Sequence, residues 1–202
     1  MISLPIIGTK ENYRVSPTKI VCVGLNYGEH VRESPSILAT ERAGWQSAGR
    51  PIERQADGSP ALPKLPVLFP KTPNVLVASG EPILIPASFL ARAGLASPRT
   101  DYEAELCVVM GRRCKDVGVG EALGAVLGYT CFNDVSQRDI QNGDKGGWWR
   151  GKSFDSFGPV GPALLPASAA PDPQRLSIEC RLNGKVVQRA STAQMLFSVA
   201  EL

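Results

Sequence analysis

The sequence predicts a mainly β protein with short helices, an α+β fold arranged as a sandwich or a rolled sheet. Its apolar runs are short, often β-branched, and separated by glycine and proline, and the chain has 20 glycines and 17 prolines. Such runs are typical of strands that are joined by tight turns. The strands expected from this pattern are residues 19–24, 75–78, 82–86, 105–111, 126–132, 160–165 and 176–182.

One hairpin and two helices can be placed. The dipeptide Asn183-Gly184 separates the segments 178–182 and 186–188, and Asn-Gly between two such segments is a strong signal of a two-residue hairpin loop. Residues 119–126 and 135–142 are expected to form helices of about two turns each. A mostly β architecture with short helices follows.

The bulk composition is that of an ordinary globular domain. With 202 residues the chain is long enough for one substantial core, and 43% hydrophobic with 20% charged residues is usual for such proteins. The 22 Lys and Arg residues are scattered among 19 Asp and Glu residues, which argues against a nucleic-acid partner. No apolar run approaches the roughly 20 residues of a membrane helix, and the first 17 residues lack the pattern of a secretory signal. We therefore expect no membrane partner either.

Cysteine usage indicates a reducing compartment. The chain has five cysteines, an odd number without C-x-x-C spacing, and four of them lie within apolar runs. Buried free thiols are the expected state, so a cytoplasmic protein is predicted.

One stretch stands apart from the rest of the chain. Residues 35–63 are rich in Gly, Pro, Ser and charged residues, and Trp45 is their only large aromatic residue. The stretch is too polar to form a core and too long for an ordinary connection. It is either a mobile lid or a tolerated surface insertion, and the sequence leaves both open.

Three acidic residues are candidates for a metal site. Glu103 and Glu105 alternate at the start of an expected strand, so their side chains project to one face. Two carboxylates this close repel each other unless a cation lies between them or one keeps its proton. Ligation by carboxylates suits Mg²⁺, Mn²⁺ or Ca²⁺ rather than zinc, whereas the alternative for the two glutamates is a solvated strand edge. Asp134, just after the expected strand 126–132, is either a third oxygen ligand or a helix N-cap.

Other polar residues offer catalytic chemistry. Arg138 and Gln141 share one face of the expected helix, where an arginine beside a metal is suited to fork a substrate carboxylate. Glu33 lies three residues after His30, the single histidine, and can orient its ring as a general base for water; an incidental surface pair is the alternative. Lys152 stands among small and apolar residues, where it would either neutralise an oxyanion or face solvent.

Six segments in order resemble the fumarylacetoacetate hydrolase family. They are VGLNYGEHVRES, PVLFPKTPN, DYEAELCVVMGR, GYTCFNDVSQRDIQ, RGKSFDSFGPVGP and LNGKVVQRASTAQMLFSV. The resemblance covers residues 19–202, so residues 1–18 are expected to be a lead-in and residues 35–63 an insertion. It implies a mixed β-sandwich roll and a homodimer.

The resemblance also implies roles for residues. By position, the metal ligands of the family match Glu103, Glu105 and Asp134, which implies Mg²⁺ or Mn²⁺, with Ca²⁺ as an alternative occupant. His30 with Glu33 matches the water-activating dyad of members that hydrolyse acylpyruvates, and Lys152 matches the active-site lysine. Residues lining the substrate pocket of the family match Tyr27, Arg138 and Gln141.

The implied activity is the metal-dependent hydrolysis of a C–C bond in a small 2-oxo acid of the acylpyruvate or fumarylpyruvate type, through an enolate. The alternative is isomerisation or decarboxylation of a 2-oxo diacid such as oxaloacetate, which needs the same enolate but no water. A third reading is a non-catalytic fragment or binding module.

Two departures from the family motivate that third reading. The segment between Glu33 and Phe69 is longer than in the family members that this chain resembles, and those members continue past Leu202 with further strands and a substrate-facing threonine. We therefore expect an incomplete catalytic domain. Residues 193–202 are expected to form a helix whose apolar stripe is either exposed or covered by a partner; the stripe is Met195, Leu196, Val199 and Leu202.

Overall fold

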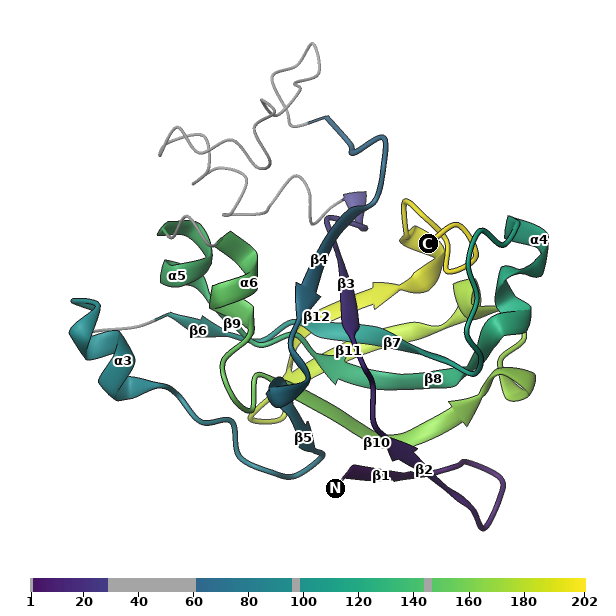
Figure 1. Cartoon of the computed structure of the whole chain (residues 1–202), viewed down its shortest axis with the longest axis horizontal. Coiled ribbons are helices and arrows are strands. Elements are labelled where there is room, and N and C mark those ends of the chain that lie inside the picture. Colours follow the sequence, from purple (N-terminus) through teal and green to yellow (C-terminus); the bar gives the residue numbers. More distant parts are fainter. Residues whose placement is uncertain (1, 29–60, 96–98, 144–146) are drawn as a thin grey trace.

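The computed structural model describes residues 2–28, 61–95, 99–143 and 147–202. Its largest sheet has four strands in the order β5-β10-β8-β7 (Figure 1). The neighbours β10–β8 and β8–β7 are antiparallel, whereas β5 runs parallel to β10. The strands are β5 (Leu76–Ala78), β7 (Ala104–Met110), β8 (Val126–Asn133) and β10 (Gly158–Pro166). The expected mainly β fold is confirmed.

In the described part of the chain, four two-stranded pairs accompany this sheet. They are β1 (Ile2–Pro5) with β2 (Asn12–Val15), β3 (Ile20–Gly24) with β4 (Val67–Lys71), β6 (Thr100–Asp101) with β9 (Ser136–Gln137), and β11 (Ser177–Leu182) with β12 (Lys185–Ser191). The predicted hairpin joins β11 to β12, and both loop residues have positive φ, 51° at Asn183 and 78° at Gly184. That conformation is the one for which Asn-Gly loops are selected.

The helices are short, as predicted. They are α3 (Ala87–Arg92), α4 (Val119–Ala122), α5 (Arg138–Gly143) and α6 (Gly147–Lys152), with 3₁₀ turns η2 (Pro73–Val75), η3 (Leu123–Ala125), η4 (Ala167–Ala169), η5 (Pro173–Arg175) and η6 (Thr192–Gln194). The helix expected at 135–142 begins later, because Ser136 and Gln137 pair with β6. Helices α5 and α6 lie side by side (Figure 1). A Cβ on Gly151 would stand 2.7 Å from the Gln141 backbone nitrogen, so this close approach requires glycine.

The core forms around the four-stranded sheet and includes the N-terminal hairpin. Its central cluster of buried apolar residues is Leu4, Val75, Phe132, Val135, Phe157, Val160 and Leu164. Leu4 lies in β1 and is 2% exposed, and Ile6 forms a parallel bridge to Leu164 of β10. Residues that read as a lead-in in the sequence thus contribute to the packed interior.

Two expected elements are wrong. Residues 82–86 form no strand: the segment lies between Pro82 and Pro86, which have no backbone N–H to donate, and Leu84 instead donates its N–H to the Ser156 hydroxyl at 2.7 Å. The expected helix 193–202 is only the single turn η6, closed by a capping box between Ser191 and Gln194.

After η6 the C-terminal segment forms bends and a turn in place of the expected helix, and Asn26 binds it. The Asn26 amide accepts from Phe197 N at 2.8 Å and donates to Phe197 O at 3.0 Å, and Asn26 O accepts from Leu196 N at 2.8 Å. Met195 forms a bridge to Tyr27. The expected apolar stripe is therefore not an exposed patch: Met195, Leu196 and Val199 are half-buried, and Leu202 is exposed.

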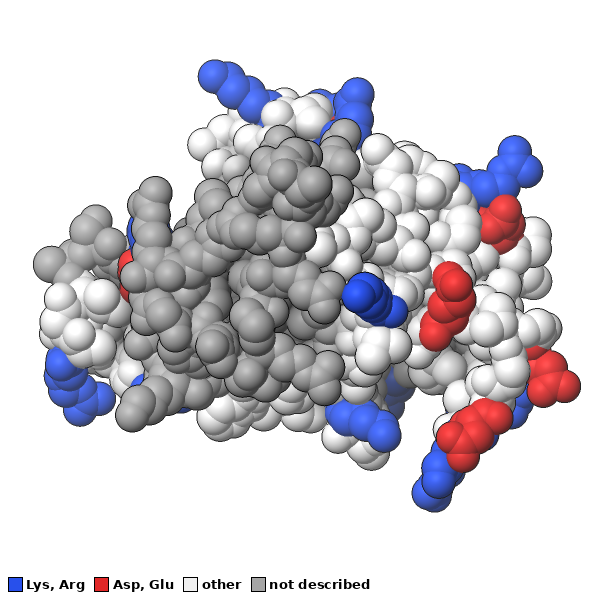
Figure 2. All heavy atoms as spheres, turned by 90° about the horizontal axis from the view of Figure 1, so that it is seen from above, with Lys and Arg blue, Asp and Glu red and all other residues white. Residues whose placement is uncertain are grey.

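All five cysteines are free, but they are less buried than expected. Cys131 is exposed because it lies on the outward-facing side of β8, and the other four are half-buried. In the part of the chain that the structure describes, no helix is long and apolar enough to cross a bilayer. Figure 2 shows described basic and acidic side chains interspersed on one face of the molecule.

Candidate active site: a buried cluster of lysines and carboxylates

Strand pairing brings the three candidate acids together. Glu103 directly precedes β7 and Glu105 lies within it, whereas Asp134 directly follows β8. Because Ala104 of β7 pairs with Asn133 of β8, the start of one strand lies beside the end of the other. The Asp134 backbone N–H donates to Glu103 O at 2.8 Å, which fixes this junction. The strand pairing thus brings Glu103 and Asp134 together, and Glu105 is near enough to interact with both charges; the convergence of all three on one cation stays a prediction.

Lys152 lies between two of these acids. Its Nζ donates to Glu103 Oε2, to Asp134 Oδ2 at 2.6 Å and to Ser136 Oγ at 2.7 Å. Its side chain is only 2% exposed, so the solvent-facing alternative for this lysine is wrong. An ammonium placed in this way can neutralise negative charge on a bound molecule as well as on the protein.

A second buried lysine, Lys71, was missed by the sequence reasoning. Its Nζ donates to Asp134 Oδ1 at 2.6 Å and contacts Val135 O at 3.3 Å. The segment PVLFPKTPN contains the signal that could have found it: Phe69 and Lys71 alternate with Leu68 and Pro70, and β4 turns the first two inward. A lysine at an inward strand position needs an acidic partner.

The pKa values of the two glutamates differ sharply. Burial alone would raise the pKa of Glu103, but the Lys152 and Arg138 cations outweigh it and lower this pKa to about 2. Burial, followed by the charges of Glu103 and Asp134, raises the pKa of Glu105 to about 8. Burial opposes the charged form of Lys152, yet Asp134 and Glu103 raise its pKa. At neutral pH Glu103 is thus ionised and Lys152 is charged, whereas Glu105 holds a proton.

Arg138 is bound by protein acids. Its Nε and Nη2 donate to Asp101 Oδ2 at 3.0 and 2.8 Å, Nη2 also lies 2.8 Å from Glu103 Oε1, and Nη1 donates to Gln141 Oε1 at 2.9 Å. The shared helix face of Arg138 and Gln141 is confirmed. Their contact with a substrate stays a prediction.

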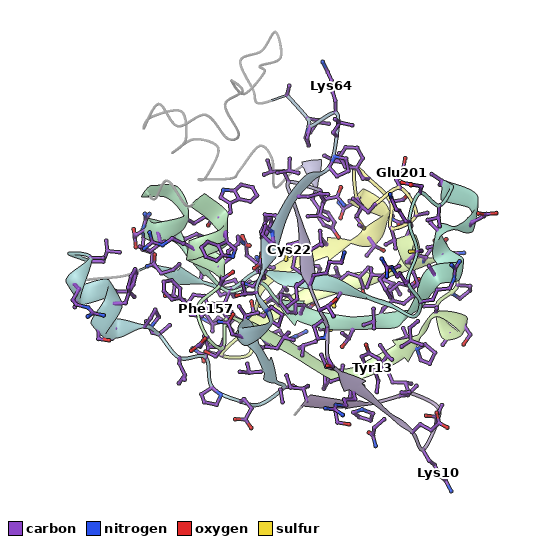
Figure 3. The ribbon with its side chains drawn as sticks, in the orientation of Figure 1. Lys10, Tyr13, Cys22, Lys64, Phe157 and Glu201 are labelled. Atoms are coloured by element: carbon purple, nitrogen blue, oxygen red, sulfur yellow. The ribbon has the colours of Figure 1, made fainter. Side chains whose placement is uncertain are left out.

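Cys22 and Tyr27 border the cluster on the β3 side. Cys22 lies near the centre of the molecule (Figure 3), and burial, with a smaller effect of Asp134, raises its pKa to about 12. Burial and then the charge of Glu105 raise the pKa of Tyr27 to about 12. Both side chains therefore keep their protons at neutral pH, and the predicted substrate contact of Tyr27 stays a prediction. His30 and Glu33 lie outside the described residues.

The acids fit a hard divalent cation by chemistry. They offer only carboxylate oxygens, and the raised pKa of Glu105 reflects burial first and then repulsion from Glu103 and Asp134, which a cation would relieve. Among the described residues, however, no three His, Cys, Asp or Glu side chains are arranged as a ready metal-ligand set. The ammonium of Lys152 stands between Glu103 and Asp134. The metal site therefore stays a prediction.

Comparison with known proteins assigns the chain to a family. The profile of the "Fumarylacetoacetate (FAA) hydrolase C-terminal" family matches residues 19–202. The chain belongs to the fumarylacetoacetate hydrolase family. It is 36% identical to the mitochondrial oxaloacetate tautomerase FAHD2A of Bos taurus over 92% of this chain and 49% of that protein. The chain thus spans about half the length of this relative, and 68% of a Methanocaldococcus jannaschii relative that is 37% identical.

Solved structures of this family share the fold. The crystal structure of 2-hydroxyhepta-2,4-diene-1,7-dioate isomerase from Mycobacterium marinum has a TM-score of 0.65 and 35% identity, and covers 91% of this chain and 55% of that one. The fumarylacetoacetate hydrolase from Exiguobacterium antarcticum has a TM-score of 0.67 and 31% identity, with 92% and 55% covered. The family contains both hydrolases and isomerases, so membership alone does not choose the reaction.

Proposed function

We propose that this chain carries the site of an enzyme that forms an enolate from a small 2-oxo acid, with Mg²⁺ or Mn²⁺ held by Glu103, Glu105 and Asp134. The observation that carries the proposal is the Lys152 ammonium, buried and bound to both Glu103 and Asp134. Removing a proton or a carbon group beside a 2-oxo group places negative charge on the keto oxygen. A fixed, desolvated cation at that oxygen is what stabilises such a charge.

The protein's own residues would act around that oxygen. Lys152 is held charged by its two carboxylate partners and would donate a hydrogen bond to the developing oxyanion. Tyr27, whose pKa is about 12, keeps its hydroxyl proton and would donate a second one. Arg138 forms ion pairs with both Asp101 and Glu103, and its positive charge would partly neutralise Glu103. A bound divalent cation would supply Lewis-acid polarisation of the 2-oxo group.

Between the two reaction types, we place keto–enol or double-bond isomerisation of a 2-oxo diacid first. Such a reaction needs the charge stabilisation that Lys152 offers and no activated water. The names of the Bos taurus tautomerase and the Mycobacterium marinum isomerase, at 36% and 35% identity, support this order. The sequence alone had favoured C–C hydrolysis, with decarboxylation as another outcome of the same enolate.

Hydrolysis of an acylpyruvate is the second candidate. The spacing of His30 and Glu33 supports it, because hydrolysis alone needs a base for water. The 31% identity to the Exiguobacterium antarcticum hydrolase supports it as well.

The homodimer that the resemblance implies is a proposal as well, and light scattering of the full chain would test it.

A substrate panel tests the proposal. The full chain, with Mg²⁺ or Mn²⁺, is assayed for oxaloacetate keto–enol interconversion and decarboxylation, for dienedioate isomerisation, and for cleavage of acylpyruvates and fumarylpyruvate. Isomerisation should be fastest, and Lys152→Met should abolish it. Faster cleavage would put the second candidate first. Cation binding without turnover of any substrate would instead support the non-catalytic reading.

A further inference from the structure

The two buried lysines contact Asp134 from different sides. Lys152 reaches Asp134 Oδ2 from the end of α6 and also binds Glu103 and Ser136. Lys71 reaches Asp134 Oδ1 from β4, and its other contact is the backbone oxygen of Val135. Lys152 therefore stands between two candidate ligands, whereas Lys71 binds one of them.

The surroundings of Lys71 leave it few other partners. Its side chain is 0% exposed, and its Nζ lies 5.9 Å from the centre of the Phe132 ring. The β4 register holds it there, since Lys71 pairs with Ile20 of β3 and follows the buried Phe69 on the same face. A lysine enclosed in this way is fixed in one position by packing as well as by its ion pair.

A cation bridging Glu103 and Asp134 would compete with Lys152 and not with Lys71. It would need the oxygens that Lys152 now binds, Glu103 Oε2 and Asp134 Oδ2. Asp134 Oδ1 would stay with Lys71, so Asp134 would offer the cation a single oxygen. A residue that binds the second oxygen of a metal-ligating carboxylate orients that carboxylate, and its loss commonly weakens metal binding.

We propose that Lys71 is a positioning residue, which holds Asp134 Oδ1 so that Oδ2 alone is presented to a divalent cation, while Lys152 is the ammonium that the cation displaces. This inference rests on the proposed function, because it assumes that the carboxylates bind a cation. It extends that function by giving the two lysines opposite effects on cation affinity.

The test is Mn²⁺ affinity, measured by calorimetry on the full chain and on three variants. Lys71→Met should weaken Mn²⁺ binding roughly 10–100-fold, as loss of an outer partner does, and Lys71→Arg should recover part of it. Lys152→Met should bind Mn²⁺ at least as tightly as the wild type, since it removes the competing ammonium. Lys10→Met is the matched control: it removes an exposed lysine at the tip of the N-terminal hairpin (Figure 3) and should leave Mn²⁺ affinity unchanged.

The outcomes separate this inference from the proposed function. If the wild type binds Mn²⁺ and Lys71→Met binds it equally well, the role of Lys71 is refuted and the metal site stands. If the wild type binds no Mn²⁺, both fail. Should Lys71→Met not fold, the Mn²⁺-bound structure of the wild type decides: Asp134 must coordinate through Oδ2 alone with Lys71 still on Oδ1, and coordination through both oxygens would overturn the inference.

Discussion

Replacing Glu105 with Gln should make the metal-free protein more stable, increasingly so as the pH rises. Burial and the charges of Glu103 and Asp134 raise the pKa of Glu105 to about 8, from an ordinary value of 4.5. The folded protein therefore holds a proton that the unfolded chain has already released. The stability associated with this proton is fully present below about pH 4.5 and is lost as the pH rises through about 8.

The magnitude follows from the same two values. Each pH unit between 4.5 and 8 changes the free energy of unfolding by about 1.4 kcal/mol, so the loss reaches at most roughly 5 kcal/mol. Glutamine has nearly the same shape as the protonated glutamate and does not titrate. The difference in unfolding free energy between Glu105→Gln and the wild type should thus be small at pH 5 and grow by up to about 1.4 kcal/mol per pH unit until pH 8.

The assay is urea unfolding of both proteins from pH 5 to pH 9 in the presence of a chelator. Glu121→Gln, at an exposed position of α4, is the control for removing a surface charge, and its difference from the wild type should stay flat. A flat difference for Glu105→Gln as well would refute the reasoning. If Glu105 is a metal ligand as proposed, adding Mn²⁺ should reverse the order, because the cation would stabilise the wild type more than the variant that lacks this carboxylate.

Three further predictions concern single residues. Glu103→Ala should abolish Mn²⁺ binding and turnover together, and calorimetry with a kinetic assay checks both; retained binding would remove Glu103 from the ligand set. His30→Ala should slow acylpyruvate cleavage by about 10²–10⁴-fold and oxaloacetate conversion less; an equal loss in both assays would contradict a water-activating role. Asn26→Ala leaves the Phe197 N–H and C=O without their amide partner, so urea unfolding should show a loss of about 2 kcal/mol. A variant with wild-type stability would show that this clamp is dispensable.

The features that the sequence predicted correctly depend on residues that are close together in the chain. Asn183-Gly184 specified its hairpin because the loop conformation depends on those two residues alone. The alternation of Glu103 and Glu105, with Asp134 at the end of another strand, was enough to suggest one acidic site.

What the sequence could not predict depends on partners that are far apart in the chain. Asn26 binds Phe197 across 171 positions, so nothing near residue 197 showed that bends and a turn would replace the expected helix. Lys71 and Asp134 are 63 positions apart, and only the β4 register makes them neighbours. The bonds from Arg138 to Asp101 and Glu103 likewise arise from the pairing of β6 with β9. Both strands have only two residues, so the pattern of apolar residues in the sequence did not predict them.

The most direct test of the central claim is oxaloacetate keto–enol interconversion by the chelator-stripped full chain, followed as Mn²⁺ is added back. The account predicts negligible conversion without the cation, activity that saturates at one Mn²⁺ per chain, and no recovery in Glu103→Ala. Conversion that the chelator does not diminish, or that Glu103→Ala retains, would contradict the account.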